Sequence, residues 1–136
     1  MLLILPLVLL LLIGTQVLQM IRLELTMGRS IPDAGTVSED MFTAFVKSDI
    51  MPHLDYGTIL DAVGFWKGEQ EQTKILYVEI PESDLPQMQP IFEMIGAAYK
   101  KAFRQDAVLI SQLQTNAIFN WWAFVTGHPT TNATGE

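Results

Sequence analysis

The order of hydrophobic patterns along residues 20–115 constrains the fold more than any other feature of this chain. Apolar and polar side chains alternate without interruption over residues 21–27, as they do in a strand with one buried face. Further strands are predicted at residues 58–66, 73–80 and 107–113, and helices at 36–51 and 87–103. This order of strand, helix, strand, strand, helix, strand predicts an α+β domain of the ferredoxin-like βαββαβ type. Two helices would cover one face of a four-stranded antiparallel sheet.

Local signals place the helices and turns. The segment Thr36-Val-Ser-Glu39 matches a capping box, in which the hydroxyl and the carboxylate accept each other's free amides. The residue before Pro52 limits the end of this first helix. Gly64 interrupts the second strand, and residues 67–72 are predicted to form a polar turn. The expected buried faces of the two helices are Met41, Phe42, Phe45 and Val46, and then Ile91, Ile95, Ala98 and Ala102.

The N-terminus carries a targeting segment. Residues 1–13 are all apolar, and no charged side chain occurs before Arg22. Such a run, extended to residue 18, is typical of a signal peptide or of a hydrophobic helix that anchors the chain in a membrane. A cleaved signal and an uncleaved anchor both remain open. Either one predicts an exported or membrane-anchored protein, extracytoplasmic and, in a bacterium, in the periplasm or at the cell surface.

The C-terminal segments lie beyond the predicted domain of residues 20–115. Residues 116–125 include the aromatic residues Phe119, Trp121, Trp122 and Phe124. They form either an extension packed on the domain or a belt at a membrane interface, where tryptophan is enriched. Residues 126–136 are polar and are predicted to be a disordered tail.

Composition excludes several kinds of function. The net charge is −7, with 8 basic and 15 acidic residues, so a nucleic-acid partner is not expected. The chain contains no cysteine and only two histidines, which excludes thiolate and histidine-rich metal sites. No phosphate-binding loop, nucleophile elbow or zinc-binding helix motif is present. We therefore expect no cofactor and no bound metal; a magnesium or calcium site made of carboxylates alone stays open, although no EF-hand spacing is present.

A family resemblance covers about two thirds of the chain. It rests on an ordered series of short stretches rather than on one motif. The clearest are Leu23-Glu-Leu-Thr-Met-Gly28, Gly35-Thr-Val-Ser38, Ile50-Met-Pro52, Leu60-Asp-Ala62, Glu71-Gln-Thr-Lys74 and Gln105-Asp-Ala-Val108. In this series the sequence resembles the bacterial domain of unknown function 3574 family. The resemblance implies a short, often exported protein, and it implies no particular activity.

Charged residues in the predicted strands define a candidate polar pocket. Lys74 shares its strand face with Leu76, Val78 and Ile80, so its ammonium should point toward the helices and need a carboxylate close by. Asp61 is the first choice, because it lies across the predicted hairpin. The pair is either a structural ion pair or part of a pocket that could hold an anion or move a proton. The candidate residues for this pocket are Asp61, Glu71, Lys74, Tyr99, Gln105 and His53. For His53 the alternatives are a cation at a helix end and a general base.

The uncovered face of the sheet is the candidate partner surface. It should carry Arg22, Glu24, Ile75 and Tyr77, and partly apolar faces of this kind often join two copies of a chain. The sequence favours an extracytoplasmic, non-catalytic binding or assembly module. One alternative is a small cofactor-free acid/base enzyme of the dimeric ferredoxin-like type, by fold analogy. Another is an accessory subunit of a membrane complex.

Overall fold

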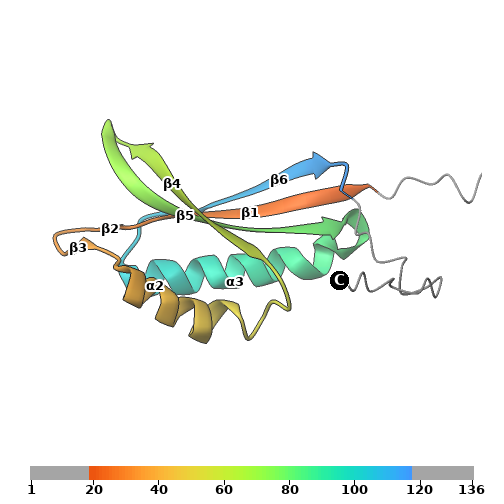
Figure 1. Ribbon diagram of the computed structural model, residues 1–136, viewed down its shortest axis with the longest axis horizontal. Helices are drawn as coiled ribbons and strands as arrows, with labels where there is room; N and C mark the ends of the chain where they lie inside the picture. Colours follow the sequence, from red (N-terminus) through yellow and green to blue (C-terminus); the bar gives the residue numbers. More distant parts are fainter. Residues whose placement is uncertain (1–18, 118–136) are drawn as a thin grey trace, which may run out of the picture.

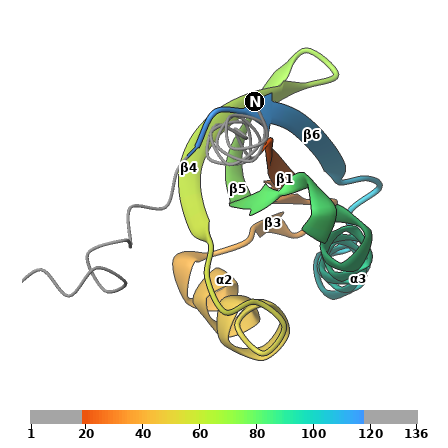
Figure 2. The same cartoon turned by 90° about the vertical axis from the view of Figure 1, so that its right-hand side faces the viewer.

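The computed structural model describes residues 19–117, in which two α-helices pack on a four-stranded sheet and a short two-stranded ladder lies beside them (Figure 1). The sheet contains β1 (Met20–Gly28), β4 (Thr58–Trp66), β5 (Glu69–Pro81) and β6 (Leu109–Thr115) in the spatial order β4-β5-β1-β6. All its pairings are antiparallel. The helices are α2 (Glu39–Phe45) and α3 (Leu85–Phe103), and both lie on the same side of the sheet (Figure 2). The predicted α+β class, the four-stranded antiparallel sheet and the order of its elements are confirmed.

Several predicted segments lie outside the described residues. They are the N-terminal hydrophobic helix of residues 1–18, the tail of residues 126–136, and all but the first two residues of the aromatic extension 116–125. Within residues 19–117, no helix is long and apolar enough to cross a membrane.

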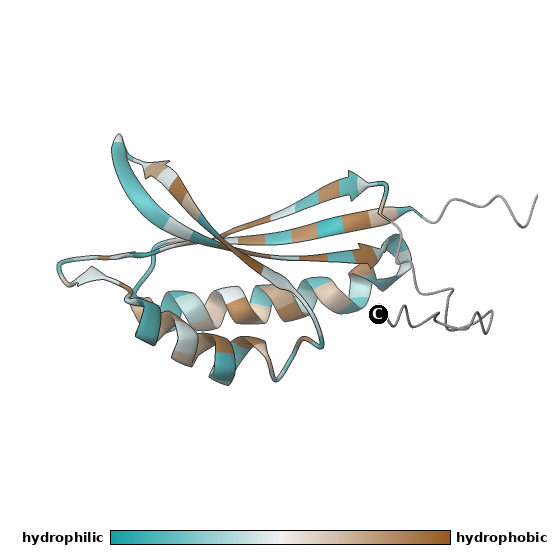
Figure 3. Ribbon diagram, in the orientation of Figure 1, coloured by the Kyte–Doolittle hydropathy of each residue, from teal (hydrophilic) through white to brown (hydrophobic). Residues whose placement is uncertain are grey.

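The alternation in β1 separates the two faces of the sheet, as Figure 3 shows by hydropathy. Leu23, Leu25 and Met27 are fully buried beneath the helices. Leu23 lies opposite Val78, and Leu25 lies opposite Leu76, so the two central strands supply the floor of one core. The intervening residues of both strands point to the uncovered face and are half-buried.

The first helix begins two residues later than the capping box implied. Ser38 is the N-cap, and its hydroxyl accepts the Met41 amide at 3.1 Å. The proposed exchange between Thr36 and Glu39 is wrong, because Glu39 starts the helix and turns its carboxylate toward two buried cations. Met41, expected on the buried face, is 41% exposed. The helix continues as a π-helical turn over Val46–Ile50.

The buried stripe of α3 is offset from the prediction. The helix begins after a 3-10 turn (Glu82–Asp84), and it buries Phe92, Ile95, Gly96, Tyr99 and Phe103. Ile91 and Ala98 pack at the margin, and Ala102 is exposed. The large aromatic side chains determine this rotation, because Tyr99 and Phe103 make edge-to-face contacts with Phe45 of the first helix.

The β4–β5 hairpin differs from its predicted boundaries. The expected polar turn of residues 67–72 is only Lys67-Gly68, both at positive φ (50° and 82°), as a two-residue type I′ turn requires. Residues 69–72 instead lengthen β5, and Gly64 does not interrupt β4. The β4–β5 hairpin therefore projects beyond the helices (Figure 1). The segment between β1 and α2 includes a small ladder of β2 (Ser30–Ile31) and β3 (Gly35–Thr36).

Candidate functional site

The uncovered face of the sheet contains a groove of about 620 Å³. The inner surface of the β4–β5 hairpin forms one wall, and the segments that follow β1 and α3 form the other. Its apolar lining includes Ala62, Trp66, Ile75, Val108 and Leu109. A cavity of this size and character is typical of a small-molecule site.

Glu71 provides a carboxylate on the floor of this groove. Its side chain lies on the opposite face of β5 from Lys74, as strand alternation predicts. Its Oε1 accepts the Ser30 amide at 3.0 Å. The carboxylate lies directly over Gly28, where a Cβ atom would stand only 2.5 Å from Oε1. The absence of a side chain at Gly28 thus makes room for the acid.

The opposite wall is held in place by Gln105. Its side-chain amide donates to the carbonyl of Ser30 at 2.7 Å and to that of Phe103 at 3.0 Å. These bonds join the end of α3 to the segment after β1, and they present Asp106 to the groove. Among residues 19–117, Glu71 and Asp106 are the only charged residues that line it. The groove therefore favours a neutral or positively charged guest over an anion.

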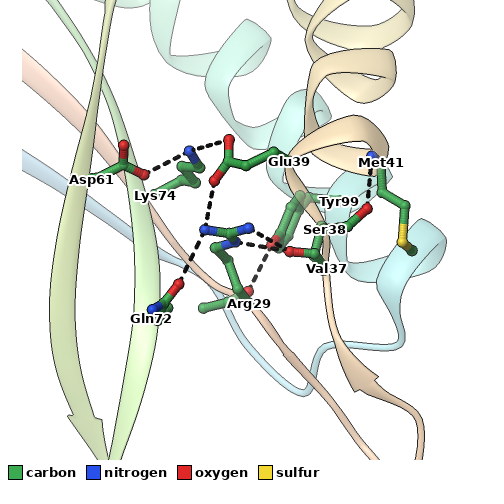
Figure 4. Close-up of polar contacts among 10 residues, drawn as sticks. Arg29, Val37, Ser38, Glu39, Met41, Asp61, Gln72, Lys74 and Tyr99 are labelled. Carbon is green, nitrogen blue, oxygen red and sulfur yellow. Dashed lines mark hydrogen bonds and ion pairs between the residues drawn. The ribbon is translucent and has the colours of Figure 1, made fainter.

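A second polar assembly lies on the helix side of the sheet, where Asp61 and Lys74 meet (Figure 4). Lys74 Nζ stands 2.6 Å from Asp61 Oδ1 and 3.0 Å from Glu39 Oε2. The other oxygen of Glu39 binds Arg29 Nη1 at 2.8 Å. Arg29 also donates to the carbonyl of Val37 at 2.7 and 2.9 Å. The predicted contact of Lys74 with a carboxylate is confirmed, and Glu39 is a partner that the strand pattern did not reveal.

This ion cluster pairs two cations, Arg29 and Lys74, with two carboxylates, Glu39 and Asp61. Both cations are buried, with side chains 5% and 8% exposed, whereas the carboxylates of Asp61 and Glu39 reach solvent. Burial alone would lower the pKa of Lys74, but the hydrogen bonds that its ammonium donates to Asp61 and Glu39 outweigh burial and raise that pKa. The Lys74 hydrogen bond lowers the pKa of Asp61. The cluster ties α2 to the sheet, and neither member of the Lys74–Asp61 pair lines the groove.

A comparison with known protein families identifies the family of this chain. A family model described as "Protein of unknown function (DUF3574)" matches residues 22–119. The chain belongs to the DUF3574 family. No curated protein sequence matches it.

Two solved structures resemble the DUF3574 fold of this chain. One is a phage SAM lyase in complex with S-methyl-5′-thioadenosine, with a TM-score of 0.53 and 13% identity. The match covers 72% of this chain and 90% of the lyase. The other is a phage SAM lyase in the apo state, with a TM-score of 0.51 and 13% identity over 74% of this chain and 84% of the lyase. At this identity the likeness shows a shared fold alone.

The DUF3574 domain does not bring the six predicted pocket residues together. Glu71 and Gln105 reach the groove, whereas Asp61 and Lys74 lie behind the sheet. Tyr99 is fully buried in the core, and its hydroxyl donates to the carbonyl of Gly28 at 2.7 Å. His53 lines a separate hollow of about 260 Å³ beside the start of α3. Sequence periodicity predicts which face of a strand or helix each side chain occupies. It does not show that the sheet and the helices keep these six residues apart.

The residues predicted for a partner surface do share the uncovered face of the DUF3574 domain. Arg22 donates to Glu79 at 2.6 Å and stacks over Tyr77, with 4.2 Å from its guanidinium carbon to the ring centroid. Glu24 stands 3.8 Å from the same guanidinium. Among residues 19–117, no group of three or more acidic or histidine residues could hold a metal ion. Trp66 and Asp106 were not among the predicted site residues, although Trp66 ends a predicted strand and Asp106 lies in the Gln105-Asp-Ala-Val108 stretch of the family resemblance.

Proposed function

We propose that this DUF3574 domain binds a small molecule in the groove of its uncovered sheet face. The observation that carries the proposal is a mostly apolar lining with two carboxylates, Glu71 and Asp106, and no lining cation from the described residues 19–117. A guest with a flat apolar part and a positive charge would satisfy both features. This reading makes the protein a binding module, and the ion cluster of Lys74 a structural support.

The phage SAM lyases supply the first ligands to test. One of them is seen with S-methyl-5′-thioadenosine, which is neutral. SAM itself carries a positive sulfonium group beside a nucleoside, so it matches the charge of this groove. We propose nucleoside thioethers and sulfonium compounds as the ligand class. The apolar wall of the groove would contact the nucleoside, and Glu71 would favour a positively charged ligand.

Calorimetric titration of the full-length protein with both compounds tests this proposal. The wild type should bind SAM more tightly than S-methyl-5′-thioadenosine. Glu71→Gln should weaken SAM several-fold and leave the neutral compound nearly unchanged, because only SAM loses a charge partner. Glu93→Gln, on the exposed side of α3, is the matched control. Failure of both compounds to bind the wild type would reject the ligand class. Equal loss of both compounds in Glu71→Gln would reject the charge argument.

Catalysis in the same groove is the second candidate function. The predicted pocket that could move a proton was centred on Asp61 and Lys74, and these two residues do not line the groove. An enzyme built on this domain would therefore use Glu71 as its proton acceptor. Mass spectrometry of each compound after incubation with the protein distinguishes the alternatives. Unchanged compound supports a binding module, and conversion that Glu71→Gln abolishes supports an enzyme.

We also propose that residues 1–18 export the domain or hold it at a membrane, as a free module or as an accessory subunit of a membrane complex. Thirteen apolar residues at positions 1–13 support this placement. The intact mass of the protein recovered from cells, with its distribution between membrane and soluble fractions, tests it. Full-length protein in the soluble cytoplasmic fraction would contradict both forms.

A further inference from the structure

The outer edge of β4 carries none of the usual protections of an edge strand. It is nine residues long, and within residues 19–117 it is paired only with β5. Free N–H and C=O groups along such an edge can pair with another strand, and proteins usually prevent this with Lys, Pro, or an unpaired charge. β4 contains neither Lys nor Pro. Its one charged residue, Asp61, is already held by Lys74 at 2.6 Å.

β4 exposes large apolar side chains on both faces of the sheet. Val63 and Phe65 are 63% and 75% exposed on the helix side, beyond the cover of α2. Trp66 and Leu60 are 55% and 44% exposed on the uncovered side. Because both faces and the edge are open at once, a neighbouring strand would bury all three together. A partner that contacted only the uncovered face of the sheet would leave the side chains of Val63 and Phe65 exposed to water.

We propose that β4 pairs antiparallel with β4 of a second copy of this chain. A two-fold axis perpendicular to the sheet at Ala62 would join the two four-stranded sheets into one. This inference goes beyond the groove and does not depend on it, although the hairpin that forms a groove wall would become the centre of the dimer.

Geometry selects the register of this pairing. A two-fold axis perpendicular to the sheet leaves the helix side of both copies on the same side. Residues that lie opposite each other across the interface must therefore point to the same face. This holds only if the axis passes between one residue and the same residue of the copy. Ala62 is the midpoint of Thr58–Trp66, and only an axis there pairs the whole strand with its copy. An axis at Asp61 would set two carboxylates directly opposite each other, which is destabilising.

The Ala62 register also matches side chains across the interface. Ile59 would lie opposite Phe65 of the copy, and Thr58 opposite its Trp66. Pairs of an aromatic and a β-branched residue are among the favourable cross-strand contacts. Leu60 would lie opposite Gly64, where a large side chain meets an open position. The two Asp61 carboxylates would lie on a diagonal, each balanced by its own Lys74.

Disulfide trapping in the full-length protein tests the proposal, because the chain has no cysteine of its own. Residues opposite each other in an antiparallel pair have Cα atoms about 4.5–5.5 Å apart, within reach of a disulfide. Ala62→Cys should therefore give a cross-linked dimer when membranes or extracts of expressing cells are oxidised with copper phenanthroline. Leu60→Cys should not cross-link, because the Cα atoms of the two introduced cysteines would lie about 13 Å apart, which is too far for a disulfide.

Two controls keep the result decisive. Ser111→Cys, on the edge strand β6, should stay monomeric. Phe65→Lys, at a side chain that is 75% exposed and outside the core, should reduce the Ala62→Cys cross-link several-fold while the circular dichroism spectrum is unchanged. Cross-linking through Ser111→Cys but not Ala62→Cys would indicate a dimer through the uncovered face, and it would overturn the proposal. A stronger cross-link from Leu60→Cys than from Ala62→Cys, or none from either, would overturn it as well.

Discussion

Lys74 Nζ lies 2.6 Å from Asp61 Oδ1, directly across the ladder between β5 and β4. The two residues are far from equivalent, because the lysine side chain is 5% exposed and the aspartate side chain 77% exposed. A buried ammonium is thus satisfied by a carboxylate that keeps most of its hydration. Glu39 from α2 provides the second carboxylate and links this pair to Arg29.

Glu39 should be the most sensitive member of the cluster. Glu39→Ala removes one partner from each of two buried cations, so we expect a loss of about 2 kcal/mol in the free energy of unfolding. Asp61→Ala affects only Lys74 and should cost clearly less. Urea denaturation of the two variants measures the order.

Asp40→Ala is the matched control for Glu39. Both residues lie in the first turn of α2, so both contribute a carboxylate to the positive end of the helix dipole. Only Glu39 binds the two buried cations, so the difference between the variants reports those ion pairs. Equal destabilisation by both would show that the cluster adds nothing beyond the dipole.

Asp61 should contribute to the dependence of stability on acid. The Lys74 hydrogen bond lowers its pKa below the usual value of 3.8. A lowered native pKa stabilises the fold above the unfolded value, and this stabilisation is lost as the pH falls through the native value. The wild type should therefore exceed Asp61→Asn slightly in urea midpoint at pH 7, and the difference should vanish in strong acid. A difference that persists or grows on acidification would contradict the assignment.

Tyr99 should control stability at the alkaline end. Burial raises the pKa of its hydroxyl to about 12, from a usual value of 10.0. A raised native pKa contributes stability that is complete below pH 10.0 and is lost as the pH rises toward about 12. Tyr99→Phe should cost about 1 kcal/mol at pH 7, because the carbonyl of Gly28 loses its donor. Urea midpoints from pH 8 to 12 should fall less steeply in this variant than in the wild type.

The parts of the fold that rest on strand periodicity were predictable. Alternation in β1 and β5 placed Leu23, Leu25 and Val78 in the core, and it oriented Lys74 toward the helices. A buried cation needs a carboxylate, so the contact with Asp61 followed from the same pattern. Helix positions were less accurate, since the apolar residues of α3 permit more than one buried stripe and the packing of Tyr99 and Phe103 selects among them.

The groove was not predictable, because it depends on the three-dimensional path of segments with little local signal. Glu71 and Gln105 were expected to join Lys74, yet they lie on the other face of the sheet or at its end. Strand alternation already placed Glu71 on the face opposite Lys74. The sequence did not show that the long β4–β5 hairpin curves, and this curvature makes a groove on that face. Glu39 was missed for a related reason: it was assigned to a capping box, whereas Ser38 alone caps the helix.

Gly28 and Glu71 should be energetically coupled. An alanine at position 28 would place its Cβ 2.5 Å from Glu71 Oε1, and the obstacle is the end of a flexible side chain. Glu71 should therefore move away and lose the Ser30 amide, while the sheet keeps its register. We expect Gly28→Ala to cost about 1 kcal/mol in the wild type, the low end for overpacking, and almost nothing when Glu71 is already alanine. A double-mutant cycle by urea denaturation measures this difference. Equal costs in the two backgrounds would mean that the backbone itself requires glycine, and the carboxylate would then have no part in it.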